Sequence, residues 1–461
     1  MASPDTITAI ATARGQAALA IVRTSGPDAV DVVDHCFRGA DLTEQDSHTA
    51  HVGYLLDEDG AEIDQVVVTL FRAPRSATGE DVVEVSCHGG DFAPQMVLES
   101  LIAHGARMAE PGEFTQRAFL NGKMDLAQAE AVADLIHASS SMAHRVSVQH
   151  LRGRYSDRLD DLREELLELC AFVELELDFA EEDVDFADLD RLRDLIQNAA
   201  SLLEELLSTT QTGEKLRDGV RVVIGGRPNA GKSTLLNALV GRDRAIVSET
   251  PGTTRDEIEA EAEIDGLRYR FVDTAGLRDT SDQIEAEGVR RAEQSIQEAD
   301  VLLYVYDLAV GLDSEEIAFL REVTSSEPHL SALLIGNKSD LVDDVPVAQI
   351  DAIPAATLSA ERGMDDSGEV APLTEWLTET VTDRLSRSDA SAVVMNQRHR
   401  QHLHDALDAV RSAQDALDAG VSGDMLTLDL RVALHELGAI TGEITNEDVL
   451  DQIFSRFCIG K

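Results

Sequence analysis

Apolar residues recur along the chain with different periods, and these periods divide it into segments. Up to about residue 120, short apolar runs alternate with turns, and the runs Leu19–Val22, Gln65–Phe71 and Val82–Ser86 are typical of strands. An apolar segment with helical spacing follows near Met96–His104. We therefore predict a small α+β domain over residues 1–120.

From residue 121 the apolar period becomes helical. One seam recurs at spacings of three and four residues, with charged faces between its members: Leu159, Leu162, Leu166, Leu169 and Val173. Helical spacing returns late in the chain, at Leu403, Leu407, Val410, Leu426, Leu430, Leu437 and Ile440. Neither half has enough apolar positions to be stable alone. We predict one helical domain in two parts, residues 121–217 and 381–461, interrupted by an inserted domain.

The inserted segment, residues 218–380, alternates strand and helix patterns, as doubly wound α/β domains do. The polar stretch Ser208–Gly213 before it has the composition of a linker, and the acidic run Glu181–Asp190 is typical of a solvated loop. The predicted fold class is therefore multidomain α/β: a small α+β domain, a discontinuous α-helical domain and an inserted Ras-like nucleotide domain.

Charge changes this picture more than any other property of the composition. The net charge is −48, and the acidic residues are spread along the whole chain, although 43% hydrophobic residues exclude a disordered acidic polymer. Such a surface suggests a salt-rich cytoplasm, where screening is strong. Lysine is scarce, so the few that remain are enriched for positions with a function: Lys123, Lys215, Lys232, Lys338 and Lys461.

Cysteine usage and hydropathy indicate where the protein works. The four cysteines are widely spaced, which argues against a disulfide framework and against a zinc site: Cys36, Cys87, Cys170 and Cys458. No apolar run is long enough to span a bilayer, and the N-terminus has no basic region followed by an apolar one. We expect a cytoplasmic protein with no membrane partner.

The stretch Val220–Ser233 carries the strongest chemical signal. A β-branched run leads into Gly226-x4-Gly231-Lys232-Ser233, the spacing of a phosphate-binding loop. Backbone N–H groups and the positive end of the following helix would surround phosphate oxygens. Lys232 would reach the β- and γ-phosphates and Ser233 would coordinate magnesium, whereas the alternative is a glycine turn with a surface lysine.

Three further motifs follow in order and exclude that alternative. Gly252–Asp256 offers Thr254 as a second magnesium hydroxyl, and Asp273-Thr-Ala-Gly276 follows a strand, where Asp273 can hold the metal through water. Asn337-Lys338-Ser-Asp340 follows another strand, and Asp340 can accept both N1–H and N2–H of guanine, which adenine cannot supply. Together with Ser359-Ala360, which fits the loop over the base, the motifs resemble the translation-factor-like GTPases.

The predicted GTP site therefore comprises four clusters of residues. They are Asn229, Ala230, Gly231, Lys232, Ser233 and Thr234; then Ser248, Glu249, Thr250, Pro251, Gly252, Thr253 and Thr254; then Asp273, Thr274, Ala275 and Gly276; and last Asn337, Lys338, Asp340, Ser359 and Ala360. Leu277 occupies the position where Ras-like proteins carry a water-orienting glutamine, so catalysis needs another group, with Asp279, Asp282 and Glu285 as candidates.

Several longer motifs are more specific than those of a GTPase. Pro111-Gly-Glu-Phe-Thr-Gln-Arg-Ala-Phe-Leu-Asn-Gly-Lys123, Asp125–Glu130, Ile440–Glu443 and the terminal Phe457-Cys-Ile-Gly-Lys461 resemble the MnmE (TrmE) family of bacterial tRNA-modification GTPases over essentially the whole chain. The resemblance implies an N-terminal domain that binds folate and forms a homodimer, a helical domain and an inserted GTPase domain.

The resemblance also implies a reaction. With the flavoprotein MnmG, in a heterotetramer, such a protein installs an aminomethyl-type group at carbon 5 of the wobble uridine of certain tRNAs. A one-carbon tetrahydrofolate supplies the methylene, and FAD and NADH are expected on the partner. The matching folate positions are Arg23, Glu84, Lys123 and Lys461, and Cys458 matches the family's C-terminal cysteine, either as a reactive thiol or as a packed side chain.

For the GTPase step, the resemblance implies potassium in place of an arginine finger. Asn229 would be a potassium ligand, and three residues would line the loop around the ion: Ser248, Thr250 and Thr253. The cation would neutralise charge on the β–γ bridging oxygen. Glu285 matches the catalytic acid that would orient water where Leu277 cannot.

Two alternative functions stay open at this level. A ribosome-assembly GTPase shares Asn229 and Leu277 but does not explain the Arg23 and Glu84 region or Cys458, and a non-hydrolysing scaffold requires that Glu285 is not catalytic. The net charge opposes an RNA substrate. Two basic groups could supply local contacts or be solvated helix faces: Arg398 with Arg400, and Arg145 with Arg152 and Arg154.

Overall fold

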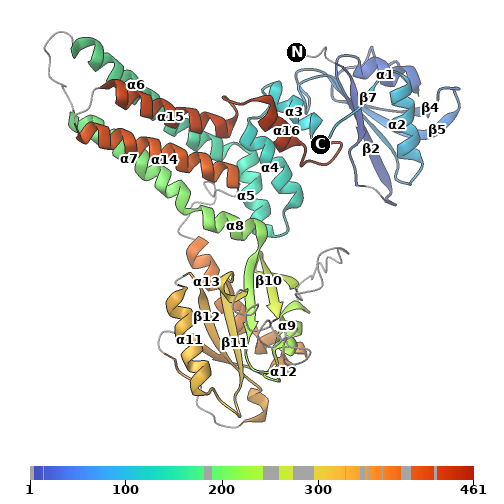
Figure 1. The fold of residues 1–461 in the computed structure, drawn as a ribbon. Helices are drawn as coiled ribbons and strands as arrows, with labels where there is room; N and C mark the ends of the chain where they lie inside the picture. The colour runs from blue at the N-terminus through green and yellow to red at the C-terminus, as the bar shows by residue number, and fades with distance from the viewer. Residues whose placement is uncertain are drawn as a thin grey trace, which may run out of the picture. The chain divides into compact units, whose positions relative to one another are not determined.

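The computed structural model describes residues 5–13, 15–180, 189–241, 259–273, 295–327, 329–342, 348–350, 353–365, 367–385, 396–419 and 423–461. The chain divides into two compact units (Figure 1). The first unit comprises Met1–Ala133, His150–Ala199 and Asp408–Lys461, and the second comprises Asp134–Gln149 and Ala200–Leu407. Among the described residues, no helix is both long and apolar enough to cross a membrane.

The first unit begins with a seven-stranded sheet in the order β3-β4-β5-β6-β2-β1-β7. The strands are β1 (Ile7–Ile10), β2 (Leu19–Ser25), β3 (Phe37–Arg38), β4 (Thr49–Leu56), β5 (Glu62–Phe71), β6 (Val82–His88) and β7 (Arg107–Met108). Helices α1 (Ala29–Cys36) and α2 (Ala93–Ala103) pack their apolar sides on one face, around Val22, Val68 and Val85. The predicted strands and helix of this domain are confirmed within a few residues.

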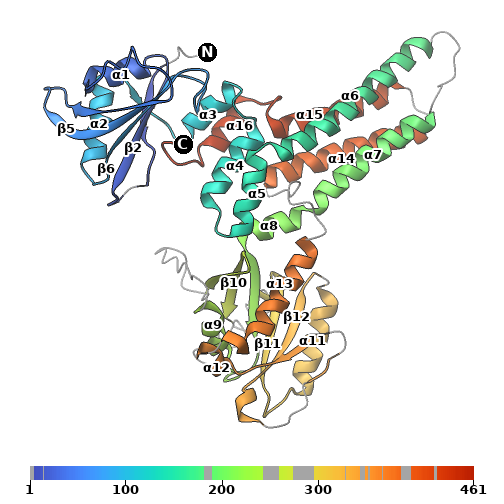
Figure 2. The same cartoon turned by 180° about the vertical axis from the view of Figure 1, so that it is seen from behind.

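Helices form the rest of the first unit (Figure 2). They are α3 (Glu113–Leu120), α4 (Leu126–His137), α5 (Ser141–Leu151), α6 (Arg154–Ala180), α7 (Leu189–Ser208), α14 (Gln397–Asp418), α15 (Gly423–Thr441) and α16 (Glu447–Phe454), of which α4, α5, α7 and α14 continue into the second unit. The predicted seam of α6 is buried along its length, from Leu159 to Val173. Helix α15 packs beside α6, and Arg163 pairs with Glu443, so two distant parts of the chain share one core.

The prediction of a linker at Ser208–Gly213 is wrong. Helix α7 ends at Ser208, and α8 begins two residues later and covers Thr210–Asp218. The Thr209 and Thr210 hydroxyls donate to the carbonyl oxygens of Leu206 and Leu207, and Gly213 N–H donates to Thr209 O at 2.9 Å. Polar residues that satisfy the backbone locally therefore turn the chain between two helices without an extended segment.

The second unit contains a six-stranded sheet in the order β13-β12-β11-β8-β10-β9. Its strands are β8 (Val220–Gly225), β9 (Glu259–Ile264), β10 (Leu267–Asp273), β11 (Val301–Asp307), β12 (Ser331–Asn337) and β13 (Ala355–Thr357). Only β9 runs antiparallel to its neighbour, β10. This order confirms the doubly wound sheet predicted from the alternating pattern.

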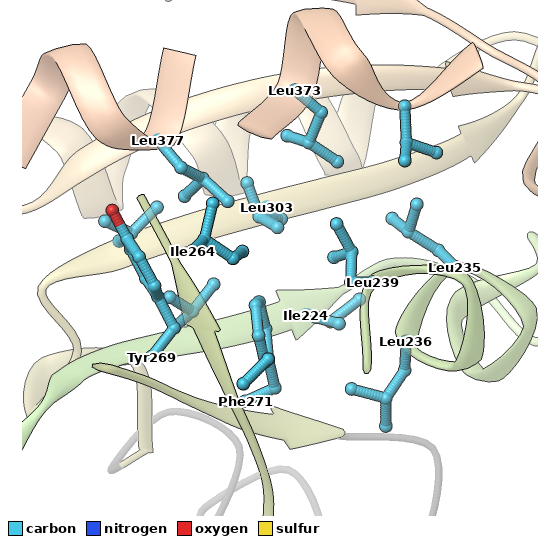
Figure 3. Packing of buried hydrophobic residues seen from close by; sticks show 14 of the residues in the cluster. Ile224, Leu235, Leu236, Leu239, Ile264, Tyr269, Phe271, Leu303, Leu373 and Leu377 are labelled. Carbon is cyan, nitrogen blue, oxygen red and sulfur yellow. The ribbon is translucent and has the colours of Figure 1, made fainter. Parts of the chain in front are cut away.

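Helices cover both faces of this sheet. They include α9 (Lys232–Val240), α11 (Ser314–Ser326), α12 (Ala360–Asp365) and α13 (Ala371–Leu385). On one face, Ile224, Leu303 and Leu373 meet α9 residues in a continuous apolar cluster (Figure 3). Val223, Leu302 and Leu320 belong to a second cluster on the other face. Strands buried on both faces read as unbroken apolar runs, which explains why their sequences lack alternation.

Candidate functional site

The phosphate loop connects the end of β8 to the start of α9. Gly226 has φ +135°, and a Cβ there would lie 2.0 Å from the carbonyl oxygen of Val305. At Gly231, with φ +97°, a Cβ would lie 2.1 Å from the Nδ2 atom of Asn337. Only glycine fits these two positions, so the loop backbone can curl closely in front of the positive end of α9.

Lys232 lies at the centre of this loop. Its side chain is 6% exposed, and its Nζ donates to the carbonyl oxygens of Gly226 and Arg227, both at 2.9 Å. A buried ammonium has to be satisfied by oxygen acceptors, and phosphate oxygens are stronger acceptors than carbonyls. The loop is thus built to hold an anion, with Ser233 following in the first turn of the helix.

Asn337 joins the phosphate loop to the loop after β13. Its Nδ2 donates to Ala230 O at 2.8 Å, and its Oδ1 accepts from the N–H of Ala360 at 2.9 Å. The side chain is 2% exposed. Two predicted base-site residues are therefore fastened directly to the predicted phosphate site.

Charged residues follow Asn337. Lys338, in the left-handed region at φ +66°, places its Nζ 2.7 Å from Oδ2 of Asp307, and this contact lowers the pKa of the Asp307 carboxyl. A hydrogen bond from the Ser359 hydroxyl lowers the pKa of the half-buried Asp340, and the charges of Arg362 and Lys338 act in the same direction. A lowered pKa keeps Asp340 ionised, which its predicted role as acceptor for the paired N–H donors of guanine requires.

Two residues of this site were not predicted. Asp307 ends β11 and holds Lys338, and Glu369 accepts from the N–H of Ser359 at 2.8 Å. The position of Asp307 directly after an apolar strand was a usable signal, because carboxyl ends of parallel strands meet at one edge. Glu369 gives no such signal, since a short turn far along the chain brings it there.

Several predicted residues lie outside the described residues. They are Ser248, Glu249, Thr250, Pro251, Gly252, Thr253, Thr254, Thr274, Ala275, Gly276, Leu277 and Glu285. Asp273 is described through its backbone, which closes β10 in register with Ile224 of β8. That register puts Asp273 at the same sheet edge as the phosphate loop.

A second polar site lies on the sheet of the first unit. Arg23 on β2 and Glu84 on β6 are Cα partners across neighbouring strands. The Arg23 Nε donates to Glu84 Oε1 at 2.9 Å, its Nη2 lies 2.7 Å from the same oxygen, and both side chains are 22% exposed. The guanidinium also lies 5.8 Å from the ring centroid of Phe114 on α3. The pair is held in place yet open to a ligand.

The C-terminal segment reaches this same sheet. Ile459 forms an isolated bridge with Pro111, and a Cβ on Gly460, at φ +95°, would lie 2.4 Å from the carbonyl oxygen of Ile10. Ile10 ends β1, whose residues pair with β2 around Arg23. The last residues of the chain, with Lys461 at the end, are thus packed tightly against the strand beside Arg23.

Lys123 contacts a loop that is tied to the end of β2. Its Nζ donates to Pro74 O at 3.0 Å, and Asn121 donates to Thr78 O in the same loop. The Thr78 and Ser25 hydroxyls lie 2.7 Å apart, which ties the loop to the end of β2. The structure therefore gathers three of the predicted folate positions and the C-terminal segment around one strand.

The cysteines differ in environment. Cys36, Cys87 and Cys170 are buried and Cys458 is exposed, and none of these four described residues forms a disulfide. Burial raises the pKa of Cys36 and of Cys87 to about 11, so neither is a reactive thiolate. In the described parts of the chain, no group of His, Cys, Asp and Glu side chains could hold a metal ion.

The six-stranded sheet, the glycine-restricted loop and the buried lysine define a P-loop GTPase domain. Comparison with known families adds the rest of the chain: the family described as MnmE helical domain matches residues 126–458, and the one described as GTP-binding protein TrmE N-terminus matches residues 6–123. The chain belongs to the MnmE family of tRNA modification GTPases.

Full-length relatives agree with this assignment. A tRNA modification GTPase MnmE from Salinibacter ruber is 71% identical, and the match covers 100% of both chains. Proteins of the same name from Christiangramia forsetii and Chlorobium phaeobacteroides are 44% and 45% identical, covering 99% of this chain and 99% and 97% of theirs. The predictions of family, fold class and GTPase activity are confirmed.

Proposed function

We propose that this chain is a potassium-dependent GTP hydrolase that acts with the flavoprotein MnmG on tRNA. The pair adds a carboxymethylaminomethyl-type group to carbon 5 of the wobble uridine of certain tRNAs, and a one-carbon tetrahydrofolate supplies the methylene. One observation carries the proposal. The C-terminal segment, which ends in Lys461, packs against β1 beside Arg23. This packing brings a cationic residue to the strands that carry Arg23 and Glu84, and these residues form a polar site separate from the GTP site.

The residues of this second site fit a folate. Glu84 can accept N–H donors of a pterin ring, while Arg23 fixes its orientation through the 2.9 Å hydrogen bond. Lys123 and Lys461 supply cations for the carboxylates of a glutamyl tail. The bound folate would supply a one-carbon group, and the protein residues would bind and orient it. Cys458 lies in the C-terminal segment and is exposed, so its thiol is accessible to react.

The GTP site fits its nucleotide and metals by the same reasoning. Lys232 would exchange its two carbonyl acceptors for β- and γ-phosphate oxygens. Ser233 and Thr254 would hold magnesium. Asn229, with Ser248, Thr250 and Thr253, would hold potassium, and Glu285 would orient the attacking water.

We infer a homodimer formed through the N-terminal sheet. The face opposite α1 and α2 carries a row of neighbouring residues from β4 to β2: Val52, Val67, Ser86 and Ile21. Val52 is 66% exposed, Val67 39% and the nearby Leu19 61%. An apolar sheet face beside Arg23 and Glu84 favours a second copy of this chain as its cover.

The remaining parts of the proposal concern the partner and the compartment. MnmG, carrying FAD and using NADH, would complete a heterotetramer with the dimer. We place the reaction in the cytoplasm, where tRNA, GTP and reduced folates are found together. The domain boundaries proposed for this chemistry are residues 1–120, 121–217, 218–380 and 381–461.

Replacing Asn229 with glycine is expected to remove stimulation of GTP hydrolysis by potassium. Asn229 has φ +61°, a conformation that glycine adopts without strain, so the loop keeps its shape and loses only the side chain, including the oxygen that would bind potassium. Loss of one group that stabilises transition-state charge lowers kcat by about 100-fold. The measurement is GTP turnover in matched KCl and NaCl, with binding of a GDP analogue as a check on the site.

Asn237→Ala is the matched control, because this asparagine lies on the exposed side of α9. It should keep full potassium stimulation. If the unmodified chain hydrolyses GTP equally fast in both salts, the potassium part of the proposal is wrong.

The wobble uridine itself tests the proposed function. Nucleosides of tRNA from a strain lacking this gene are expected to lack the carbon-5 modification in mass spectra, and the intact gene should restore it. Restoration with Asn229→Gly should be poor, since slow turnover limits the coupled reaction. Unchanged modification in the deletion strain would exclude the proposed reaction.

A further inference from the structure

Three stretches of this acidic chain are unusual because they contain no Asp or Glu: residues 6–27, 135–156 and 219–242. They are the longest such stretches, although 87 of the 461 residues are acidic. The first contains Arg23 of the proposed folate site, and the third contains the phosphate loop. Each of these two therefore coincides with a site for an anionic ligand, whereas the middle stretch has no ligand assigned to it.

Burial does not explain the absence of acids from the middle stretch. The first and third stretches contain buried strands, where a carboxylate would be costly. Residues 135–156 instead include many exposed positions on helices and in a turn, among them His144, Arg145, Arg152 and Arg154. Exposed helical positions are where the rest of this chain places its acids, so their absence here is a local property of the surface.

Arg152 and Arg154 flank Gly153 in the turn between α5 and α6. Both are exposed, and the structure gives neither guanidinium an ion pair with any carboxylate of the described residues. Most other arginines of the first unit do have such a partner, as Arg107 has Glu113 and Arg163 has Glu443. Arg152 and Arg154 are neighbouring positive charges, and neither is paired with a carboxylate of the described residues.

The turn that carries them is held firmly. Gly153 has φ +84°, its N–H donates to His150 O at 2.9 Å, and its carbonyl accepts from Asp157 N–H at 2.8 Å. Gln128 on α4 donates to Leu151 O at 3.2 Å, and a Cβ on Gly153 would lie 3.1 Å from the same Nε2. The two arginines thus project from a backbone with little freedom, which lowers the entropy lost on binding.

Helix stability does not account for Arg154 either. It is the first residue of α6, and the start of a helix favours acids and disfavours cations. The next residue, Tyr155, is 0% exposed and its ring stacks on His150 at a centroid separation of 5.0 Å, so α6 is anchored without any help from Arg154. An arginine here adds to positive potential at the surface.

We propose that Arg152 and Arg154 bind the phosphate backbone of the tRNA. The proposal rests on the proposed function, which supplies tRNA as the substrate. A chain of net charge −48 repels RNA over most of its surface, so approach requires a local positive site. At about 1 M salt the Debye length is about 3 Å, so only direct guanidinium–phosphate contacts persist, and two rigidly held arginines suit them.

A protein partner is the other class of ligand for such a site. Protein interfaces are centred on apolar and aromatic anchors, and the arginines that they contain surround such anchors. The exposed residues of the turn are the two arginines, with no apolar side chain between them. The site therefore favours RNA.

The test uses the full-length chain, alone and with MnmG, and the double variant Arg152→Gln/Arg154→Gln. Its Kd for tRNA is expected to rise about tenfold or more, and the slope of log K against log[KCl] to become shallower by about 1 to 2, one phosphate contact for each arginine. GTP binding and basal GTP turnover should not change. Arg152→Lys/Arg154→Lys keeps both charges and should retain most of the salt slope.

Arg75→Gln/Arg456→Gln is the matched control, because both arginines are exposed, lie in the same unit and have no ion pair with a carboxylate of the described residues. It should bind tRNA like the unmodified chain. Equal tRNA affinity of the Arg152→Gln/Arg154→Gln variant would overturn the proposal, and so would weakened binding of MnmG with unchanged binding of tRNA. If the unmodified chain and its complex both fail to bind tRNA, the proposed function itself fails.

Discussion

Alanine in place of Lys232 is expected to lower the affinity for GTP by about two to three orders of magnitude and to abolish turnover. Lys232 is 6% exposed and its ammonium is the cation aimed into the phosphate loop. Truncating one partner of a buried charge pair costs roughly 2–5 kcal/mol, or about 1.5 to 3.5 orders of magnitude in affinity, and the expected loss lies within that range. Titration with a fluorescent GTP analogue and single-turnover hydrolysis measure the two effects.

Lys215→Ala is the matched control for this substitution. Lys215 lies in the same unit, and its Nζ pairs with Asp300 Oδ1 at 2.8 Å, away from the loop. The control should bind GTP normally, with at most a small loss of thermal stability from one ion pair. A Lys232→Ala variant that binds GTP within about threefold of the unmodified chain would contradict the assigned role.

Transfer from concentrated to dilute salt is expected to lower the melting temperature by about 10 °C or more. For a domain of 150–250 residues, each kcal/mol lost from the free energy of unfolding lowers the melting temperature by about 2–4 °C. The net charge of −48 makes the carboxylates repel one another across the folded surface. Their repulsion extends over about 10 Å at 0.1 M salt and over about 3 Å at 1 M. Thermal melts followed by circular dichroism from 0.05 to 2 M KCl measure the effect.

Sodium chloride provides the control for the salt experiment. Screening depends on ionic strength alone, so NaCl should restore stability as well as KCl does. GTP turnover should still respond only to potassium, which separates the two effects of salt. A melting temperature that is the same in dilute and concentrated salt would show that surface repulsion is not a major term.

Local patterns were sufficient for most elements of the fold. The seam from Leu159 to Val173 and the strand Val220–Gly225 are buried as their periods predicted. The linker at Ser208–Gly213 failed because composition does not record where a hydroxyl donates, and Thr209 and Thr210 bond back to the preceding helix. Helices and strands are predicted correctly where apolar residues recur with a regular period along one buried face. The prediction fails at the junction between two helices, where no such period exists.

The candidate sites divide in the same way. The phosphate loop was predictable because its residues are contiguous, and Lys232 must lie near Gly226 whatever the rest of the chain does. Asp307 and Glu369 were missed, because their contacts with Lys338 and Ser359 depend on how strands and turns come together. Contacts between residues far apart in the sequence produce no periodic pattern of apolar residues, so the sequence pattern does not predict them.

By itself, the sequence of this protein determined the strands, the helical seams, the GTP motifs and the acid-free stretches, because each of these features depends only on residues close together in the sequence. The tertiary structure decided that Arg23 faces Glu84 across two strands, and that Asn337 fastens the phosphate loop to Ala360. It also decided that the last residues of the chain return to β1 beside Arg23. The register between β2 and β6 and the close packing of glycines against neighbouring atoms determine these contacts. Both form only when segments distant in the sequence come together in the folded chain.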